Sequence, residues 1–249
     1  MTDSKPMQTP MDENAALQIV ADAESFDATL YCQTVGCLIY LCNTRPDIQF
    51  VVSQVSRFMQ NPTMLHWKVV KRIFRYLKGT SNYAMVFSKS THLLLKGFSD
   101  SDWEGDRNTR RSTSGFCFYL GDCLISWLSK RQPTIATSSC EAESRAAFTA
   151  TLELVWLQKI FSYLDVRVHK PIQIFSDSES AIAIANNLVH HARTKHIEIH
   201  YHYIREQLAK KHIELVYVPS SENVADIFTK ALTRDNHEKM CRLLKLVPI

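Results

Sequence analysis

Four acidic side chains of this sequence stand where apolar residues are expected. Asp100 closes the apolar run LLLKGFSD, and Asp177 closes a second run, PIQIFSD. Glu143 shares one stripe of an expected helix with alanine and leucine residues, so its side chain is expected to point into the core. Its neighbour Glu141 lies about 200° around that helix and is expected to be solvated. Asp226 lies in an expected last helix. A carboxylate buried in such places costs several kcal/mol unless a cation meets it.

Each acid also has an ordinary explanation: a turn for Asp100, a helix cap for Asp177 and a surface position for Asp226. Taken together, they suit a single site at the carboxyl edge of a sheet, where open α/β sheets place their sites. Like charges at such an edge repel one another unless a divalent cation neutralises them. Oxygen ligands suit Mg²⁺ or Mn²⁺ and do not suit zinc. Because two such ions are the usual means of hydrolysing a phosphodiester, the acids indicate a metal-dependent nuclease.

Short apolar runs and amphipathic stretches predict the elements that would hold these acids. Residues 31–80 look helical. The pattern then indicates strands over 93–100, 113–120 and 123–129, a helix over 140–164, a strand over 171–177, helices over 178–188 and 192–211, a strand over 213–218 and a helix over 221–232. This order is typical of an α/β sandwich with a mixed sheet.

Composition and charge describe a globular chain with a mild positive balance. The 249 residues are 45% hydrophobic, and 29 Lys and Arg stand against 25 Asp and Glu, which gives a formal charge of +4. That charge is too small to establish a nucleic-acid partner and is compatible with a local basic surface. The seven cysteines form no CxxC pair, which favours reduced thiols over a disulfide framework. Because the sequence has neither a membrane-length apolar run nor a secretory pattern at its N-terminus, we expect an intracellular location.

One expected helix in the first third of the chain has a cationic face. Its basic residues recur at three- or four-residue steps opposite an apolar face: Lys68, Lys71, Arg72, Arg75 and Lys78. Such a face is either solvated or in contact with a phosphate backbone. The arginines of the loop between the first two strands of the sheet, Arg107, Arg110 and Arg111, have the same two explanations.

With these residues assembled, the sequence closely resembles the C-terminal end of the Pol polyprotein of copia-type LTR retrotransposons. Blocks similar to the family's follow in its order from about residue 31: YCQTVGCLIYLCNTRPDI, FMQNPTMLHWKVVKRIFRYLKGT, FSDSDWEGDRNTRRSTSGFCFYLG, LISWLSKRQPTIATSSCEAESRA, DSESAIAIANN, ARTKHIEIHYHYIRE and YVPSSENVADIFTKAL. The first two resemble the thumb and connection of a reverse transcriptase, and the rest resemble a ribonuclease H.

A domain division follows from this resemblance and from the polar start of the chain. Polar composition predicts a flexible leader over 1–28. The resemblance implies a helical segment like the reverse transcriptase thumb and connection over 29–90. It also implies a ribonuclease H-like α/β domain over 92–235, with a mixed five-stranded sheet flanked by helices, and a C-terminal tail over 236–249.

The resemblance also implies a role for each acid. Asp100, Glu143 and Asp226 match the family's metal ligands, and Asp177 matches the aspartate that holds metal and orients the attacking water. The implied cofactor is Mg²⁺, with Mn²⁺ as an alternative, and the implied substrate is the RNA strand of an RNA–DNA hybrid. The remainder of a reverse transcriptase is an expected partner, and no membrane is expected.

Several other residues are expected to contact the nucleic acid. Thr137, Ser138 and Ser139 match positions that meet the minor groove of the hybrid, where a 2′-hydroxyl distinguishes RNA from DNA. The basic residues expected to contact the hybrid are Arg193, Lys195, Arg110, Arg111, Lys71 and Arg75.

Three features depart from the family's pattern. No catalytic block of a polymerase precedes residue 31, so the chain by itself is not expected to be a working reverse transcriptase. Cys140 and Ser144 stand in CEAES where the family commonly has Ser or Thr and Tyr, so we expect altered packing around Glu143. The loop YVPSSENVAD lacks the histidine that cellular ribonucleases H use near the last aspartate, so we expect slower product release.

Three other functions stay open on the sequence alone. His196 and His200 are four residues apart, the spacing of paired zinc ligands on a helix, although no glutamate follows His196 as in zinc proteases. The family resemblance supplies a simpler interpretation, in which that basic, aromatic helix faces the nucleic acid. A fragment adopted by a host could bind nucleic acid without catalysis. A secreted effector is the weakest alternative, because the sequence has neither a secretory pattern nor an Arg-x-Leu-Arg motif.

Overall fold

The computed structural model describes residues 4–13, 17, 23–89, 93–186 and 195–249. It divides the chain into two compact units. The helical unit comprises Met1–Val86, Arg107–Thr109 and Lys230–Ile249. The sheet unit comprises Phe87–Asp106 and Arg110–Thr229. Among the described helices, none has the length and apolar character needed to cross a membrane.

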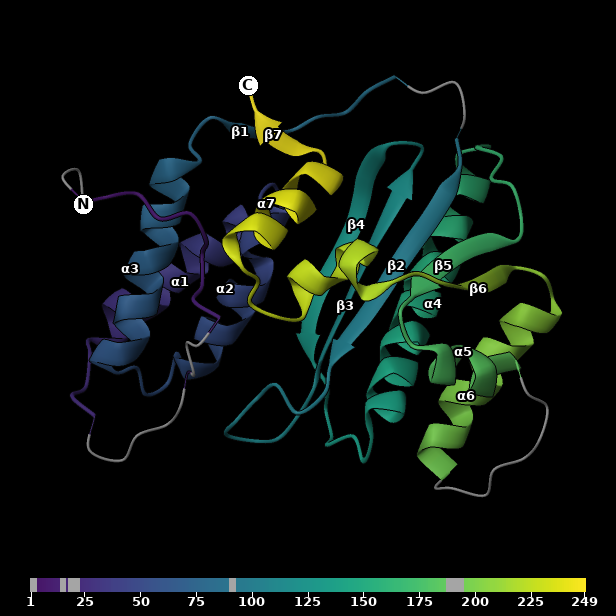
Figure 1. Cartoon of the computed structure of the whole chain (residues 1–249), viewed down its shortest axis with the longest axis horizontal. Coiled ribbons are helices and arrows are strands. Elements are labelled where there is room, and N and C mark those ends of the chain that lie inside the picture. The colour runs from purple at the N-terminus through teal and green to yellow at the C-terminus, as the bar shows by residue number, and fades with distance from the viewer. Residues whose placement is uncertain (1–3, 14–16, 18–22, 90–92, 187–194) are drawn as a thin grey trace. The chain divides into compact units, whose positions relative to one another are not determined.

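The sheet unit is built on five strands in the order β4-β3-β2-β5-β6 (Figure 1). Their bounds are β2 Leu95–Asp102, β3 Thr113–Leu120, β4 Cys123–Arg131, β5 Ile172–Ser176 and β6 Ile213–Tyr217. The first three form an antiparallel meander, whereas β5 pairs in parallel with both β2 and β6. The predicted α/β class and the mixed five-stranded sheet are therefore confirmed.

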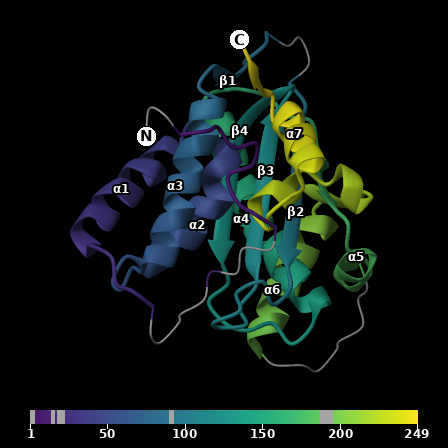
Figure 2. The same ribbon diagram turned by 60° about the vertical axis from the view of Figure 1, so that its left-hand side comes forward.

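Three helices complete this unit: α4 (Ser139–Tyr163), α5 (Glu179–Asn186) and α6 (Lys195–Ala209). In Figures 1 and 2, α4 lies behind the sheet. The core between them contains Phe118 of β3, Leu154 of α4 and Ile174 of β5, which are fully buried. Gly97 of β2 faces Phe118 closely, since a Cβ atom there would lie 2.3 Å from the Phe118 ring. This contact explains why a strand that packs against α4 has a glycine at that position.

The helical unit contains α1 (Ala28–Leu41), α2 (Gln49–Val55), α3 (Met64–Gly79) and α7 (Arg234–Leu243). Its two short strands, β1 (Tyr83–Met85) and β7 (Leu246–Pro248), pair in antiparallel register. Two single turns of 3₁₀ helix, Pro46–Ile48 and Ser56–Phe58, flank α2. Aliphatic and aromatic residues from α1, α2 and α3 form one continuous core.

A buried ion pair lies at the centre of the helical unit. The Arg45 guanidinium donates two hydrogen bonds to the Asp47 carboxylate, at 2.7 and 2.9 Å, and two more to Thr80. The Tyr76 hydroxyl donates to Asp47 at 2.5 Å and lies 3.9 Å from the Cys241 sulfur of α7. Burial, followed by the Asp47 charge, raises the pKa of Tyr76 far above its ordinary value, so the phenol stays protonated as a donor. The pair thus joins α3 to the C-terminal helix.

The described part of the predicted flexible leader packs against α3. Met11 is buried in the helical core, and Met7 packs against it. Arg72, Arg75 and Lys78 of the cationic face donate to the backbone carbonyls of Thr9, Lys5 and Ser4, respectively. Much of the basic face that the sequence offered to a phosphate backbone is therefore engaged by the chain's own carbonyl groups.

The C-terminal region also differs from the sequence-based expectation. The helix predicted over 221–232 is wrong, because two 3₁₀ turns, η3 (Ser220–Glu222) and η4 (Val224–Phe228), occupy most of that stretch. Asn223 has an extended ψ of 103° between them, and its side chain caps η4 instead of continuing a helix. The predicted tail over 236–249 is ordered as α7 and β7, and the unit boundary lies between Thr229 and Lys230.

We predict that Asp47→Ala lowers the free energy of unfolding of the helical unit by about 3–5 kcal/mol, because it leaves a buried guanidinium uncompensated. Urea titration of the full chain would measure the change. Asp12→Ala is the matched control, since the Asp12 carboxylate pairs with Arg72 while 54% exposed and should cost less than about 1 kcal/mol. Equal losses in the two variants would contradict the role given to Asp47.

Candidate metal centre

Three of the four predicted acids converge at one edge of the sheet. Asp100, Glu143 and Asp177 each offer a carboxylate oxygen, and these oxygens lie within 4.8 Å of one another. The parallel register explains the pairing of the two aspartates, because Phe98 lies opposite Phe175 and each aspartate follows two residues later. Asp100 lies inside β2, two residues before its end, and Asp177 directly follows β5.

Helix α4 supplies the third acid. Ser138 begins the helix as its cap, and Glu143 lies in its second turn, where the predicted inward stripe places it against β2. The backbone N–H of Ser101 donates to Glu143 Oε1 at 3.2 Å. Asp100 is 2% exposed and Glu143 is 9% exposed. The strand and the helix therefore hold two buried carboxylates side by side.

The donor set fits a divalent cation. All three groups are carboxylates, the ligands that Mg²⁺ and Mn²⁺ prefer. Two arginines of the sheet unit have other partners, since Arg131 pairs with Asp106 and Arg145 with Glu141. Bringing anionic groups this close without a counter-charge is unfavourable, so a bound cation would relieve their repulsion.

Asp226 lies close by but is held differently. Among the described residues, the acids that meet within 4.8 Å do not include it. It is buried in the 3₁₀ turn η4. The Thr229 hydroxyl, at the end of this turn, donates to Asp100 Oδ2 and also contacts the carbonyl oxygen of Asp226 at 3.2 Å. Thr229 thus connects the turn that contains Asp226 to the first acid of the cluster.

Asn223 supports the acid cluster through hydrogen bonds, a role that the sequence analysis missed. Its side chain is fully buried, and its Nδ2 group donates to the Ser99 carbonyl at 3.1 Å and lies 3.5 Å from Asp177 Oδ1. Its Oδ1 accepts from the Ala225 N–H at 3.2 Å, and Ser220 donates to the other Asp177 oxygen. One amide therefore connects β2, Asp177 and η4. The sequence feature that could have revealed this role is the asparagine directly before VADIF, because asparagine commonly caps helices.

Gly115 explains how η4 comes so near the sheet. This glycine of β3 lies directly opposite Asp100. A Cβ atom there would lie 2.7 Å from Thr229 Cγ2, 2.8 Å from Phe228 Cβ and 3.2 Å from the Ala225 carbonyl oxygen. Only glycine leaves space for the turn to pack directly on the strand backbone.

The expectation that Glu141 is solvated is wrong. Its carboxylate is buried and accepts hydrogen bonds from the Thr137 N–H and hydroxyl, at 2.9 and 2.6 Å, and from Arg145. Burial raises its pKa, but the Thr137 hydrogen bonds and the Arg145 charge outweigh that effect, so the pKa is lowered. An acidic side chain in the first turn of a helix can bond to the residues that precede the helix. Its angular position around the helix axis does not reveal this contact.

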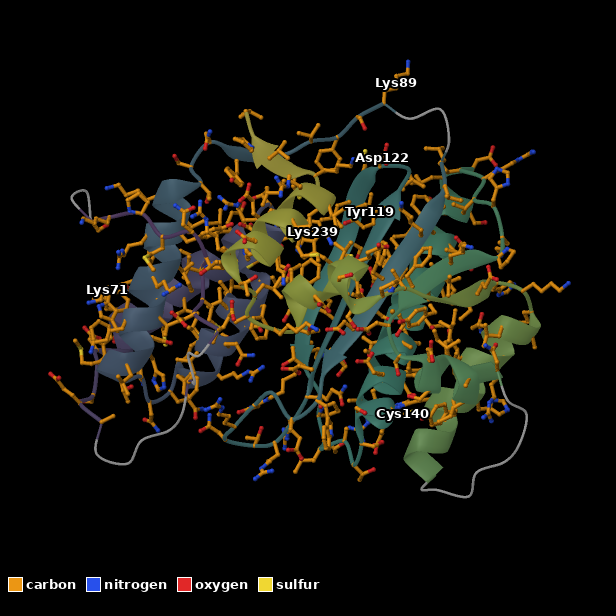
Figure 3. The ribbon with its side chains drawn as sticks, in the orientation of Figure 1. Lys71, Lys89, Tyr119, Asp122, Cys140 and Lys239 are labelled. Atoms are coloured by element: carbon orange, nitrogen blue, oxygen red, sulfur yellow. The ribbon has the colours of Figure 1, made fainter. Side chains whose placement is uncertain are left out.

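Of the two departures in CEAES, Cys140 lies at the start of α4 (Figure 3), and Ser144 follows four residues later in the same helix. The Ser144 hydroxyl lies 2.9 Å from the Tyr201 hydroxyl of α6 and 2.8 Å from the Cys140 carbonyl oxygen. The Ser144 side chain thus contacts a tyrosine from a neighbouring helix. The altered packing expected near Glu143 stays a prediction.

The described residues that are predicted to contact nucleic acid come from both units. Thr137, Ser138 and Ser139 are exposed before and at the start of α4. Arg110 pairs with Glu104 at 3.1 Å, and Arg111 is half-buried. Lys71 projects from α3 in the helical unit (Figure 3), where Arg75 also lies.

Several predictions for the histidine-rich helix fall outside the described residues. Arg193 is not described, and neither are the side chains of Lys195 and His196. The zinc alternative therefore stays a prediction. The one described member of that histidine pair, His200, stacks on Phe148 with ring centroids 4.1 Å apart.

Known proteins resemble this chain over nearly its whole length. A retrovirus-related Pol polyprotein from transposon RE1 of Arabidopsis thaliana is 39% identical over 234 residues, 94% of this chain and 16% of that protein. The chain thus spans about a sixth of that relative. The secreted RxLR effector protein 161 of Plasmopara viticola is 44% identical over 128 residues, 51% of this chain and 90% of the effector. No protein-family model matches.

Comparison with solved structures also finds a similar chain. The N-terminal RNase H domain of a Mycobacterium tuberculosis protein is 14% identical to this chain, with a TM-score of 0.41 over 60% of this chain and 97% of that chain. At this level of identity, the likeness concerns the fold alone.

We predict that Asn223→Ala destabilises the sheet unit by about 1–3 kcal/mol, because the buried Ser99 carbonyl loses its donor and η4 loses its cap. Urea unfolding of the full chain would measure the loss. Asn186→Ala, at an exposed position at the end of α5, should change stability by no more than about 0.5 kcal/mol. If Asn223→Ala lowered the free energy of unfolding no more than this control, the supporting role given to Asn223 would be wrong.

Proposed function

Because this chain belongs to the family of retrovirus-related Pol polyproteins of copia-type transposons, we propose that its sheet unit is a magnesium-dependent ribonuclease H. In this proposal it cleaves the RNA strand of an RNA–DNA hybrid. The observation that carries the proposal is the convergence of Asp100, Glu143 and Asp177 within 4.8 Å at the carboxyl edge of the sheet. That donor set suits the hydrolysis of a phosphodiester and suits no other chemistry suggested by the sequence.

The acids of the cluster differ in burial, and we assign them different roles on that basis. Bound Mg²⁺ would supply the charge that neutralises the phosphate and activates water. Asp100 and Glu143 are buried and braced by Thr229 and Ser101, so they hold the cation in place. Asp177 is half-buried, so it can reach a water molecule that enters from solvent and orient it toward the phosphorus. We propose Asp226 as the fourth acid of this site.

Hydrolysis then needs little movement of the protein. The water oxygen forms a bond to phosphorus and loses a proton to solvent, the bond to the leaving ribose oxygen breaks, and that oxygen takes up a proton from solvent and departs as a hydroxyl group. Ser220 and Asn223 hold both oxygens of Asp177, which keeps this carboxylate aimed while the reaction proceeds.

We expect recognition of the hybrid to use hydroxyl-bearing residues at the start of α4 together with basic residues of both units. Thr137, Ser138 and Ser139 are exposed residues with hydroxyl groups, which suit ribose 2′-hydroxyls in the minor groove. Arg110, Arg111, Lys71, Arg75, Arg193 and Lys195 are proposed contacts to the phosphate backbone. The remainder of a reverse transcriptase is the proposed protein partner, since the chain spans about a sixth of the RE1 polyprotein.

A second candidate function is favoured by one relative. The 44% identity to a secreted effector covers 90% of that effector. We propose as this second candidate that a fragment related to this family acts as a secreted effector outside its cell of origin. Fractionation of producing cells separates the two, because an effector would accumulate in the medium and a Pol fragment would not.

We predict that Asp177→Asn lowers cleavage of a labelled RNA–DNA hybrid about 100-fold or more. Loss of a residue that only supports a metal ligand typically costs about 10- to 100-fold, and loss of the ligand itself should cost more. Its melting temperature should not fall, because removing one charge relieves repulsion among the acids. Purified full chain would be assayed with Mg²⁺ and with chelator. Asp122→Asn, in the turn between β3 and β4 (Figure 3), is the matched control and should cleave normally. Unchanged cleavage by Asp177→Asn would sink the assignment.

A further inference from the structure

Trp103 is an exposed indole near the carboxylate cluster. It follows β2 directly, three residues after Asp100, and 50% of its surface is exposed. Three residues of extended chain reach about 10 Å, which corresponds to roughly three nucleotide steps along one strand. The indole therefore lies within reach of nucleotides that flank a phosphate at the cluster.

Hydrogen bonds hold this indole in place. Trp103 Nε1 donates to the carbonyl oxygen of Ala136 at 3.3 Å. On either side of it, the Thr113 N–H donates to Asp102 and the Glu104 N–H donates to Ser112 at 3.3 Å. An exposed ring that is fixed at its edge keeps one orientation before a ligand arrives, so less entropy is lost on binding.

The chain around Trp103 offers apolar and hydroxyl groups more than free cations. Ala136 is preceded by Ile135, which is 52% exposed, and followed by the exposed Thr137. The arginines that bracket this segment, Arg131 and Arg145, are paired with Asp106 and Glu141. Such a surface suits the sugars and base edges of a nucleic acid better than its phosphates.

We propose that the face of the Trp103 indole packs against a sugar or base edge of the hybrid, close to the phosphodiester that is cut. This contact would determine which phosphodiester of the RNA strand reaches the acids. The proposal rests on the ribonuclease H function and adds to it a substrate-binding residue that lies outside the acid cluster.

Binding without cleavage tests this directly. A fluorescently labelled RNA–DNA hybrid would be titrated with the full chain in the presence of chelator, and anisotropy would give the dissociation constant. Trp103→Ala should weaken binding about tenfold, in line with the value of one aromatic stacking contact. Trp103→Phe keeps a ring and loses the bond to Ala136, so it should bind within about threefold of the unchanged protein.

Trp156 provides the matched control. It lies on α4 of the same unit and is 55% exposed, and Trp156→Ala should leave hybrid affinity unchanged. Equal weakening by Trp103→Phe and Trp103→Ala would overturn the proposal, because the bond to Ala136 and not the ring would then matter. No weakening by Trp103→Ala would also overturn it.

Oxidative footprinting adds a readout that does not depend on substitution. Hydroxyl radicals would oxidise both exposed tryptophans in the free protein, and bound hybrid should protect Trp103 several-fold while Trp156 stays reactive. A chain that binds hybrid with Trp103 protected but never cleaves would contradict the nuclease function and leave this contact standing. A chain that cleaves while Trp103 stays fully reactive would reject the contact alone.

Discussion

The sheet unit depends on one electrostatic constraint: carboxylate oxygens of Asp100, Glu143 and Asp177 lie within 4.8 Å of one another, two of the acids in a buried setting. Their repulsion must be opposed by rigid surroundings. Neutral donors provide this, namely the Ser101 amide, the Thr229 hydroxyl and the Asn223 side chain. Because these donors stabilise the charges without cancelling them, the cluster keeps the negative charge that attracts a divalent cation.

The close packing of η4 against β3 follows from the same constraint. Thr229 and Asn223 reach their acids only because Gly115 lets the turn lie directly on the strand backbone. A larger residue there would push away the turn and the donors with it. The glycine, the turn and the acids therefore act as one unit, although they come from distant parts of the sequence.

Much of this arrangement could be predicted because it follows from local patterns. Short apolar and aromatic runs predicted the strands, and the apolar stripe of α4 placed Glu143 inward. Asp100 and Asp177 were expected together because both close apolar runs, and the parallel pairing of Phe98 with Phe175 brings them side by side. Periodicity and the ends of apolar runs are short-range properties, so the sequence could indicate the acids, whereas the register that brings Asp100 beside Asp177 joins strands far apart in the chain.

The errors arose where long-range contacts override local preference. The composition of SENVADIFTKAL is typical of a helix. The Asn223 side chain instead forms hydrogen bonds with Ser99 and Asp177, and the chain forms two 3₁₀ turns. The helical periodicity places Glu141 on the outward face of α4, but its hydrogen bonds with Thr137 and Arg145 bury its carboxylate at the start of the helix. The C-terminal segment pairs with a strand more than 150 residues earlier, β1 with β7, which no local pattern encodes.

Metal binding by the acid cluster is the central claim, and its most direct test is a Mn²⁺ titration of the full chain followed by electron paramagnetic resonance. We expect saturable binding that Glu143→Gln, a change of charge with little change of shape, weakens at least about tenfold. Mg²⁺ should compete for the same site. Equal Mn²⁺ affinity in Glu143→Gln and the unchanged chain would place the metal elsewhere and contradict the account.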